Sequence, residues 1–437
     1  MVMATHQRKY AISLVSYKMF NNISVIGLGY IGLPTAAMLA SKKKNVVGVD
    51  KNIKVVDTIN NGKIHITEPK LEEIVSDSVK DGFLKAIHTP VAADAFIIAV
   101  PTPFISQKSQ IPKPNLEYVK AAAKSIASVL KFGDLIILES TSPVGTTEQL
   151  SIWLSELRSD LSFPHQKGSS SDVNIAYCPE RVLPGKIVSE LKENDRVIGG
   201  ISEKCSHKAL ELYKIFVEGE CVVTNARTAE MSKLTENACR DVQIAFANEL
   251  SVICENMDIN VWELISLANR HPRINILEPG PGVGGHCIAV DPWFIASSDP
   301  KNSKIIQTAR NVNDAKPDWV INKAKIEINN CIESGAKTKK EDITIACFGL
   351  TFKADIDDLR ESPAMRIAAD IIEFHEGNVV VVEPNILNSK VEMMNLVDIE
   401  YALKNADIAI LLVDHSEFKE LGRPNIPIII DTRGIWS

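Results

Sequence analysis

The sequence predicts an α/β protein in which two parallel-sheet domains flank a helical central domain with a long helix. Short apolar segments alternate with helical patterns from about residue 22, an order typical of parallel sheets covered by helices. The strand pattern stops near residue 210 and resumes after about residue 330. The chain of 437 residues also exceeds one ordinary hydrophobic core, so two or three domains are expected.

The first sheet domain is expected over residues 22–210. Its opening segment, ISVIGLGYIGLPTAAMLA, predicts a short strand, a glycine turn and a helix of small residues. Further strands are expected at NVVGVD, AFIIAVPTP, DLIILESTSPVG and VNIAYCPER. Residues 1–21 are basic with weak apolar content and lack the apolar run and cleavage site of a signal peptide. We expect them to form a disordered extension.

The central helical domain is expected over residues 211–325. The segment TAEMSKLTENACRDVQIAFANELSVICENM keeps helical periodicity over about thirty residues without proline or glycine. A helix of that length usually bridges domains or packs against a partner. Its apolar positions cover more than one face, which favours a homodimer: Leu234, Ala238, Ile244, Ala245 and Leu250.

A second sheet domain is expected over residues 326–437. Alternation of strands and helices resumes there, with strands expected at DITIACFGL, NVVVVEP, DIAILLVD and IPIIIDTRG. These runs are rich in valine and isoleucine, as is typical of strands buried on both faces. The C-terminal domain is therefore expected to hold a second parallel sheet.

Composition and charge exclude several classes of function. Hydrophobic residues make up 45% and charged residues 24% of the chain, a mixture typical of soluble globular proteins. The net charge of −7 argues against a nucleic-acid partner, and no apolar run approaches the length of a membrane span. The eight cysteines show neither a CxxC pair nor zinc-like spacing. We therefore expect no metal, no disulfide framework and a reducing cytoplasm.

A GxGxxG sequence follows the first expected strand and opens the first helix. Its glycines let a ligand approach the backbone closely, and the helix N-terminus attracts a pyrophosphate. The next strand ends in Asp50, 18 residues after the last glycine, where an acid favours NAD over NADP. Two threonines lie at later strand ends, on the same edge. The residues expected to bind NAD in this Rossmann-like domain are Gly27, Leu28, Gly29, Tyr30, Ile31, Gly32, Asp50, Thr102 and Thr141.

Three polar residues share one face of the long helix. Lys233, Asn237 and Arg240 stand at positions i, i+4 and i+7. A lysine and an amide one turn apart are suited to stabilising an alkoxide or an oxyanion. The alternative interpretation is a solvated polar stripe.

The segment GPGVGGHCIAVDPWF places Cys287 behind a run of glycines. Glycines permit a tight loop that presents a thiol to a ligand, whereas a structural cysteine normally lies in an apolar helix or strand. Asp291 adds an acid four residues later, and a nearby cation such as Lys233 would lower the thiol pKa from about 8.5. The alternative is a small residue packed in the core.

The loop FGLTFKADIDDLRESPA in the second sheet domain is dense in charge. Lys353 and Arg360 stand beside Phe352, a set suited to clamping a phosphate and a ring. Arg433 near the C-terminus adds a cation, which gives an acidic protein a local cationic site. The alternative is a solvated surface loop.

Together these segments resemble the UDP-glucose/GDP-mannose dehydrogenase family. The resemblance runs from about residue 22 to the end and is carried by VIGLGYIGLP, VPTP, ESTSPVGTTE, NIAYCPERVLPG, AEMSKLTENACRDVQIAFANEL, PGPGVGGHCIAVDPWF and FGLTFKADIDDLRESPA. It implies a homodimer that binds NAD on the first lobe and UDP on the second. The implied reaction is a twofold, NAD-dependent oxidation of a sugar C6 alcohol to a carboxylate. Cys287 would hold the intermediate aldehyde as a thiohemiacetal and then as a thioester.

Further roles follow from the resemblance, position by position. Lys233 and Asn237 would stabilise the oxyanion, and Asp291 and Glu180 would assist proton transfer and water activation. Arg360 would lie near the cofactor. The residues implied to contact the UDP-sugar are Arg181, Val182, Lys233, Asn237, Arg240, His271, Arg273, Gly284, Phe352, Lys353 and Arg433.

The substrate implied by the resemblance is a UDP-N-acetylhexosamine. The segments NRHPRINILEPGPGVGGHC and CPERVLPGK are most similar to bacterial family members that oxidise UDP-N-acetyl-D-mannosamine for surface polysaccharide synthesis. UDP-N-acetylglucosamine is the alternative and UDP-glucose a further one, although UDP-glucose members typically carry serine where this chain has His286. Two other functions stay open: a two-electron hydroxyacid dehydrogenase of the phosphogluconate type, and a non-catalytic nucleotide-sugar sensor.

Overall fold

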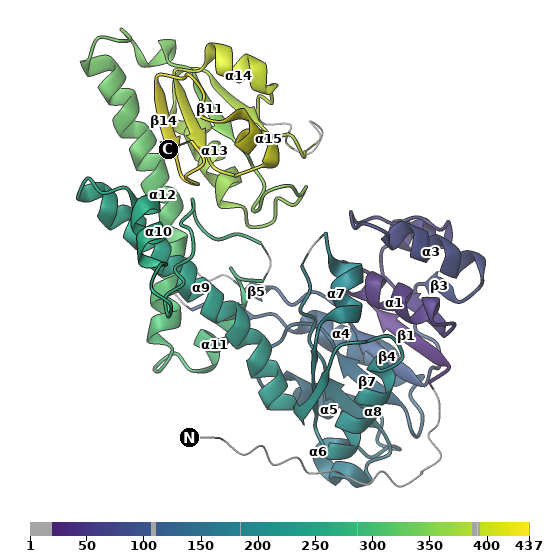
Figure 1. Cartoon of the computed structure of the whole chain (residues 1–437). Helices are drawn as coiled ribbons and strands as arrows, with labels where there is room; N and C mark the ends of the chain where they lie inside the picture. The colour runs from purple at the N-terminus through teal and green to yellow at the C-terminus, as the bar shows by residue number, and fades with distance from the viewer. Residues whose placement is uncertain are drawn as a thin grey trace.

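The computed structural model describes residues 20–105, 111–183, 185–285, 287–386, 391 and 394–436. Nearly all of the extension expected at residues 1–21 lies outside the described residues. The described chain forms two α/β lobes joined by long helices, which confirms the predicted fold class (Figure 1). The first lobe is at the lower right of the view and the second at the upper left.

The first lobe is built on an eight-stranded sheet. Across it the strands lie in the order β10 (Cys221–Asn225), β9 (Arg196–Gly200), β8 (Asn174–Tyr177), β7 (Leu135–Leu138), β4 (Ala95–Ile98), β1 (Asn22–Ile26), β2 (Asn45–Val49) and β3 (Leu84–Ile87). Neighbours pair in parallel, except that β8 and β9 pair antiparallel. The apolar residues of β4 and β7 are all buried, as expected in the centre of a covered sheet.

Helices connect these strands. They are α1 (Gly32–Ser41), α2 (Ile53–Asn60), α3 (Leu71–Lys80), α4 (Glu117–Ala127), α5 (Thr146–Leu157), α6 (Pro164–Lys167), α7 (Ile187–Glu193) and α8 (Glu203–Tyr213), with a small ribbon of β5 (Phe104–Ile105) and β6 (Lys113–Pro114). The sheet continues beyond residue 210 through β10, which the sequence pattern does not reveal. Its residues are exposed or half-exposed, so this edge strand has no apolar core-facing run.

The long helix α9 (Ala226–Asn256) runs from the first lobe to the centre of the molecule (Figure 1). Glu230 near its start is fully buried, and its carboxylate accepts hydrogen bonds from the backbone nitrogens of Gly145 (2.6 Å) and Thr147 (2.8 Å) at the beginning of α5. A carboxylate at a helix N-terminus satisfies amides that lack a partner within the helix. These bonds hold α9 in a fixed position against the first lobe.

The central helices connect α9 to the second lobe. α12 packs against α9, α11 and also α13, so it links the centre of the molecule to the C-terminal sheet. The helices named here are α10 (Val261–Ala268), α11 (Asp291–Ser298), α12 (Lys304–Glu333) and α13 (Pro363–Phe374).

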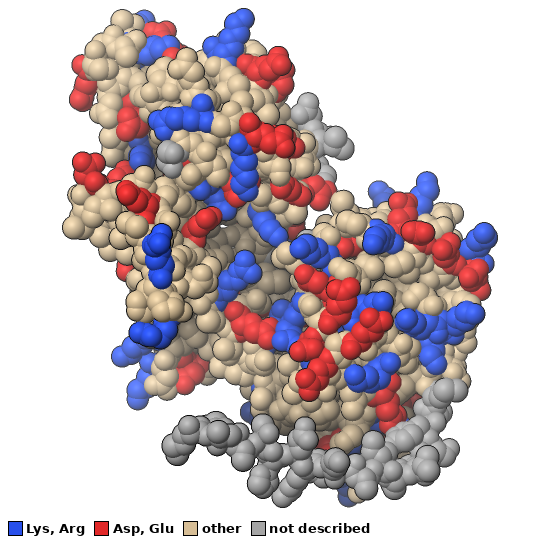
Figure 2. Space-filling model, viewed as in Figure 1, with Lys and Arg blue, Asp and Glu red and all other residues tan. Residues whose placement is uncertain are grey.

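The second lobe contains a four-stranded parallel sheet with its own apolar core. The strands lie in the order β12 (Val379–Val382), β11 (Ile345–Phe348), β13 (Ile408–Leu411) and β14 (Ile428–Asp431). α13 is joined in this lobe by α14 (Ile399–Asn405) and α15 (Ser416–Leu421). Figure 2 shows the surface hollowed between the lobes, with lysine and arginine side chains around the hollow. Local positive charge is thus available in a chain whose net charge is −7.

Candidate active site

The glycine turn between β1 and α1 is closed on one side and open on the other. A Cβ on Gly32 would lie 1.8 Å from the Gly27 carbonyl oxygen, and Gly27 has a φ of +92°, which other residues rarely adopt. Gly29 is exposed, and a Cβ there would meet no atom within 4 Å. The open side lies at the N-terminus of α1, so it fits the pyrophosphate of a dinucleotide.

Asp50 ties the end of β2 to this turn. Its carboxylate accepts hydrogen bonds from the backbone nitrogens of Leu28 (3.0 Å) and Asn52 (2.9 Å). The Leu28 side chain is fully buried, so this residue presents only its backbone to a ligand. The half-buried carboxylate of Asp50 keeps acceptor capacity for ribose hydroxyls, and it would repel a 2′-phosphate.

The other residues expected at the cofactor site come from two lobes. Thr102 Oγ1 donates a hydrogen bond to the Thr141 carbonyl oxygen (2.6 Å), so the chain segments that follow β4 and β7 meet. Arg360 comes from the second lobe, and its guanidinium carbon lies 5.1 Å from the ring centroid of Tyr30. Ile31 is half-buried at the start of α1. The structure thus brings Arg360 to the glycine turn, as the resemblance implied.

The glycine loop before Cys287 packs tightly against the loop that carries Phe352. A Cβ on Gly284 would lie 2.7 Å from the Phe352 Cβ, and one on Gly285 would lie 2.9 Å from the Phe352 ring. The Gly285 nitrogen also donates to the Arg360 carbonyl oxygen (3.0 Å). The glycines are therefore needed for close contact between two loops, and Cys287 is exposed at the end of theirs.

The charge environment of Cys287 differs from the one expected. Although Cys287 is exposed, the surrounding protein desolvates its thiolate, and this effect and the charge of Asp291 raise the pKa of the thiol, while Lys233 and Arg360 act in the opposite direction. Lys233 does act to lower the thiol pKa, as expected, but the expected net lowering is not found, because Lys233 and Arg360 together do not outweigh desolvation and a nearby carboxyl. His286, the residue before the cysteine, lies outside the described residues.

Lys233, Asn237 and Asp291 form a group beside the cysteine. Asn237 Nδ2 donates a hydrogen bond to Asp291 Oδ2 (2.5 Å), which joins α9 to the first turn of α11. Burial raises the pKa of Asp291 to about 7, against the lowering effects of the Asn237 hydrogen bond and the Lys233 charge. A carboxyl with that pKa exchanges a proton readily near neutral pH.

Lys353 and Arg240, two residues implied to contact the UDP-sugar, are accompanied by a third cation, Lys186. Burial lowers the pKa of Lys353, and the charges of Arg240 and Lys186 lower it further, so both cations lie near enough to act on Lys353. Lys186 stands directly before α7 in the first lobe, and the sequence analysis missed it. Its position behind a proline–glycine pair gave no sign that it would face a lysine of the other lobe. The trio is suited to binding a dianion.

Glu180 belongs to a buried charge cluster, and of its members the sequence motifs indicated only Glu180 itself. Glu180 forms an ion pair with Arg196, whose Nη1 also lies 3.6 Å from Glu139 Oε1. Tyr213 donates its hydroxyl to the same Glu139 oxygen (2.8 Å). Burial raises the pKa of both carboxyls, while Arg196 acts in the opposite direction. A detectable signal existed, because Glu139 and Arg196 adjoin or open strands that are otherwise apolar.

Comparison with known proteins places the chain in a family. Family models of the UDP-glucose/GDP-mannose dehydrogenase family match it in three parts: the NAD binding domain at residues 21–217, the central domain at 227–315 and the UDP binding domain at 346–437. The chain belongs to the UDP-glucose/GDP-mannose dehydrogenase family. The family membership predicted from the sequence motifs is therefore confirmed.

The dehydrogenase is similar over nearly its whole length to proteins named as dehydrogenases of N-acetylated nucleotide sugars. It is 60% identical to the UDP-N-acetyl-D-mannosamine dehydrogenase of Yersinia pestis, over 95% of this chain and 99% of that one. It is 58% identical to the NDP-N-acetyl-D-galactosaminuronic acid dehydrogenase of Ralstonia solanacearum, over 96% and 97%. The structure of UDP-D-ManNAc dehydrogenase from Pyrococcus horikoshii aligns with a TM-score of 0.83 at 36% identity, over 95% and 96%.

NAD is the cofactor of the dehydrogenase, because its first lobe matches the NAD binding domain of the family. The chain fits this cofactor, with an open approach at Gly29 and an acidic acceptor at Asp50. The oxidoreductase class predicted from the sequence is confirmed. Across the part of the chain that the structure describes, no helix combines the length and the apolar character needed to cross a membrane.

Two arginines implied to bind substrate are held by acidic partners in the dehydrogenase. Arg181 forms an ion pair with Glu236 on α9 (3.0 Å). Arg433 forms one with Asp414 (2.6 Å), and a Cβ on Gly280 would lie 2.6 Å from its Nη1. Arg433 is thus positioned beside the glycine loop, whereas Arg181 serves at least to join α9 to the first lobe.

The remaining expected residues make other contacts. Val182 is half-buried and packs against the core of the first lobe. His271 and Arg273 are both exposed after α10, where the Arg273 nitrogen donates to His271 Nδ1 (3.4 Å). Their roles in substrate binding stay predictions from the resemblance.

Proposed function

We propose that this dehydrogenase oxidises the C6 alcohol of UDP-N-acetyl-D-mannosamine to the carboxylate in two steps, through a covalent intermediate on Cys287. The observation that carries the proposal is the exposed thiol beside Lys233 and the Asn237–Asp291 pair. A two-electron hydroxyacid dehydrogenase has no need of such a thiol. Identities near 60% to full-length UDP-N-acetyl-D-mannosamine dehydrogenases support the choice of sugar.

The first half of the proposed reaction uses the group on α9 and α11. Asp291 accepts the proton of the C6 hydroxyl, for which a pKa of about 7 is well matched. NAD, when bound, would supply the hydride acceptor for each oxidation, with a second NAD replacing the NADH formed in the first. The Cys287 sulfur then bonds to the aldehyde carbon as its thiol proton passes to water, and the carbonyl oxygen becomes an oxyanion. Lys233 and Asn237 stabilise that oxygen by charge and by hydrogen bonding.

The second half of the proposed reaction releases the product. Oxidation of the thiohemiacetal gives a thioester, and water then adds to its carbonyl carbon. Glu180 takes the proton from this water; burial raises the pKa of its carboxyl, which strengthens it as a base, and the ion pair with Arg196 limits that rise. The carbon–sulfur bond then breaks, Glu180 passes the proton from the water to the departing sulfur, and the product leaves as the acid, which ionises to the carboxylate.

The proposed substrate site lies between the lobes. Lys353, Arg240 and Lys186 bind the diphosphate, and Phe352 packs against the nucleotide or sugar. The second lobe, which matches the UDP binding domain, supplies Lys353, Phe352 and Arg433. The further contacts proposed from the resemblance are Arg181, Val182, His271, Arg273 and Gly284.

The sugar specificity is tested with four substrates. Purified enzyme with NAD should give two NADH per UDP-N-acetyl-D-mannosamine and no free aldehyde. UDP-N-acetylglucosamine, UDP-N-acetylgalactosamine and UDP-glucose should react with much lower kcat/KM. The galacto sugar is included because the Ralstonia relative is almost as similar as the mannosamine enzymes. A higher kcat/KM for any other sugar, or one NADH per sugar, would contradict the proposal.

We further propose that the enzyme is a cytoplasmic homodimer. The positions Leu234, Ala238 and Ala245 of α9 are buried within the chain itself, so they do not need a partner. A different stripe is exposed instead, with exposed fractions of 51% at Phe246, 44% at Ile253 and 63% at Met257. These residues share one helix face, and a second copy would cover them. All eight cysteines are free thiols, which supports a reducing compartment.

A further inference from the structure

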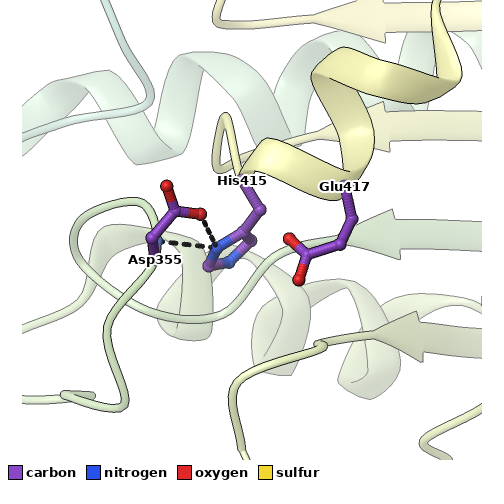
Figure 3. Close-up of side chains that lie close together, drawn as sticks. All are labelled: Asp355, His415 and Glu417. Carbon is purple, nitrogen blue, oxygen red and sulfur yellow. Dashed lines mark hydrogen bonds and ion pairs between the residues drawn. The ribbon is translucent and has the colours of Figure 1, made fainter.

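Asp355, His415 and Glu417 form a cluster in the second lobe that resembles a metal site. Their side chains offer oxygen and nitrogen atoms that lie within 4.8 Å of one another (Figure 3). His415 is fully buried, however, and both of its ring nitrogens already have partners. Nδ1 lies 3.0 Å from both the Asp355 backbone nitrogen and Asn385 Nδ2, and Nε2 lies 3.2 Å from a carboxylate oxygen of Glu383.

These contacts assign the protons on the imidazole. The Asp355 amide can only donate, so Nδ1 must accept, and the Glu383 carboxylate accepts from Nε2–H. A metal ion would need a nitrogen lone pair that is here occupied by hydrogen bonds. These residues are therefore better explained as a hydrogen-bonded brace than as a metal centre. The brace consists of His415, Glu383, Asn385 and the backbone of Asp355.

The brace holds one end of the loop 350–361, which carries Phe352 and Lys353. Glu383 accepts hydrogen bonds from the backbone nitrogens of Leu350 (2.6 Å) and Thr351 (3.3 Å). Thr351 Oγ1 lies 3.4 Å from His415 Nε2 and donates to the Lys353 carbonyl oxygen (2.8 Å). The buried imidazole of His415 thus contacts Thr351, and Thr351 in turn is hydrogen-bonded to Lys353.

The same brace holds the loop at a strained position. Asp355 has a φ of +60°, in the left-handed region that residues other than glycine rarely adopt. Its nitrogen donates to His415, and its carboxylate accepts from the nitrogen (2.9 Å) and hydroxyl (2.8 Å) of Ser416. A strained backbone persists only where its surroundings fix it, and here His415 and the start of α15 do so.

The far side of this loop contacts the glycine loop of the active site. Phe352 packs against Gly284 and Gly285, and the Arg360 carbonyl oxygen accepts from Gly285. A change in the path of residues 350–361 would therefore move Lys353 away from the diphosphate position. It would also disturb the packing next to Cys287.

We propose that His415 is a positioning residue for UDP-sugar binding, which fixes the loop 350–361 and so the placement of Phe352 and Lys353. The inference rests on the proposed function of this loop. His415 does not touch the substrate in this proposal and acts through the backbone of Thr351 and Asp355. Its effect should therefore appear in the affinity for the UDP portion and leave the first lobe unaffected.

The test measures UDP and NAD binding separately by calorimetry on the full-length enzyme. His415→Gln keeps an amide donor toward Glu383 and loses the Nδ1 acceptor, whereas His415→Asn keeps an acceptor toward Asp355. Both should weaken UDP binding by about tenfold or more. The affinity for NAD should fall clearly less than the affinity for UDP, because most of the NAD site lies on the first lobe and, of this loop, Arg360 alone was expected there. In turnover, KM for the UDP-sugar should rise more than kcat falls.

A matched control is available in the same lobe. His375 is also buried, and its Nε2 lies 2.9 Å from the Ile343 carbonyl oxygen, with no bond to the loop. His375→Gln should leave UDP affinity unchanged. If the His415 variants do not fold, Thr351→Val removes the hydroxyl that bonds to the Lys353 carbonyl oxygen and contacts His415 Nε2, and it should still weaken UDP binding. If instead Thr351→Val folds and binds UDP as tightly as wild type, the positioning role of the brace is excluded even without folded His415 variants.

Each outcome has a distinct meaning. Equal UDP affinity in wild type and the His415 variants would overturn the inference while leaving the proposed function intact. An equal loss of NAD affinity would also overturn it, because it would indicate general damage. Reduced UDP affinity of wild type after treatment with a chelator would favour a metal at the cluster and exclude the brace. Absence of UDP binding by wild type would instead contradict the proposed function itself.

Discussion

Asp291→Asn should stabilise this enzyme while it abolishes the reaction. The wild-type carboxyl is 3% exposed, and its pKa is raised from 3.8 to about 7, mainly by burial. A carboxyl with a raised pKa in the folded state favours folding only while it stays protonated. Stability is therefore complete below about pH 4 and is lost as pH rises toward 7. The amide side chain introduced by Asp291→Asn carries no charge at any of these pH values, so the variant does not lose stability in this way.

The magnitude follows from the difference between about 7 and 3.8, which is about 3 pH units. At about 1.4 kcal/mol per unit, the unfavourable free energy reaches about 4 kcal/mol. A carboxylate in the first turn of α11 also gains about 0.5 kcal/mol from the helix dipole, which the amide loses. We expect the unfolding free energy of Asp291→Asn to exceed that of wild type by about 3 kcal/mol at neutral pH.

The assay is denaturant unfolding of both proteins at several pH values between about 5 and 8, with steady-state kinetics on the same samples. The stability difference should widen with pH and level off above about 7. Asp241→Asn is the contrasting control. Burial raises the pKa of Asp241 as well, but the amide would leave the buried Arg310 guanidinium without this ion pair (2.7 Å), so stability should fall by about 3 kcal/mol instead of rising. If Asp291→Asn is no more stable than wild type at pH 8, or the difference does not widen, the reasoning is refuted.

Three further changes test other parts of the proposal. Cys287→Ser should keep UDP-sugar and NAD binding but lose turnover by orders of magnitude, because an alkoxide forms far less readily than a thiolate; uronate production near the wild-type rate would exclude the thioester. Asp50→Ala should narrow the preference for NAD over NADP, and comparable kcat/KM for both cofactors in wild type would contradict the role of its charge. Phe246→Glu should turn a dimer into a monomer in sedimentation, because it puts a charge in the exposed stripe of α9; a wild type that is monomeric at micromolar concentration would rule out the dimer.

Much of this protein is determined locally, and that part is accessible from the sequence. The turn from Gly27 to Gly32 needs glycine because a Cβ would collide with its own backbone. The apolar runs of β4 and β7 are buried on both faces, so their pattern is unambiguous. The long helix follows from periodicity without proline or glycine. The glycines before Cys287 likewise mark a loop that approaches another closely.

Features that depend on residues distant in the chain could not be predicted in this way. Periodicity places apolar residues all round α9, but only packing decides that Ala245 is covered by the chain itself and Phe246 is not. A short polar edge strand such as β10 gives no signal, because its ladder of hydrogen bonds comes from β9.

The electrostatics of the site were decided by the tertiary structure. The sequence identifies Cys287, Lys233 and Asp291 as reactive groups, yet the directions of the pKa shifts come from burial, which has no local signature. The approach of Lys186 to Lys353 joins two lobes, and the Glu180–Arg196 pair joins two segments of the first sheet. Local sequence determines which groups the chain can offer. Only the packing of distant segments determines their neighbours, their solvation and therefore their chemistry.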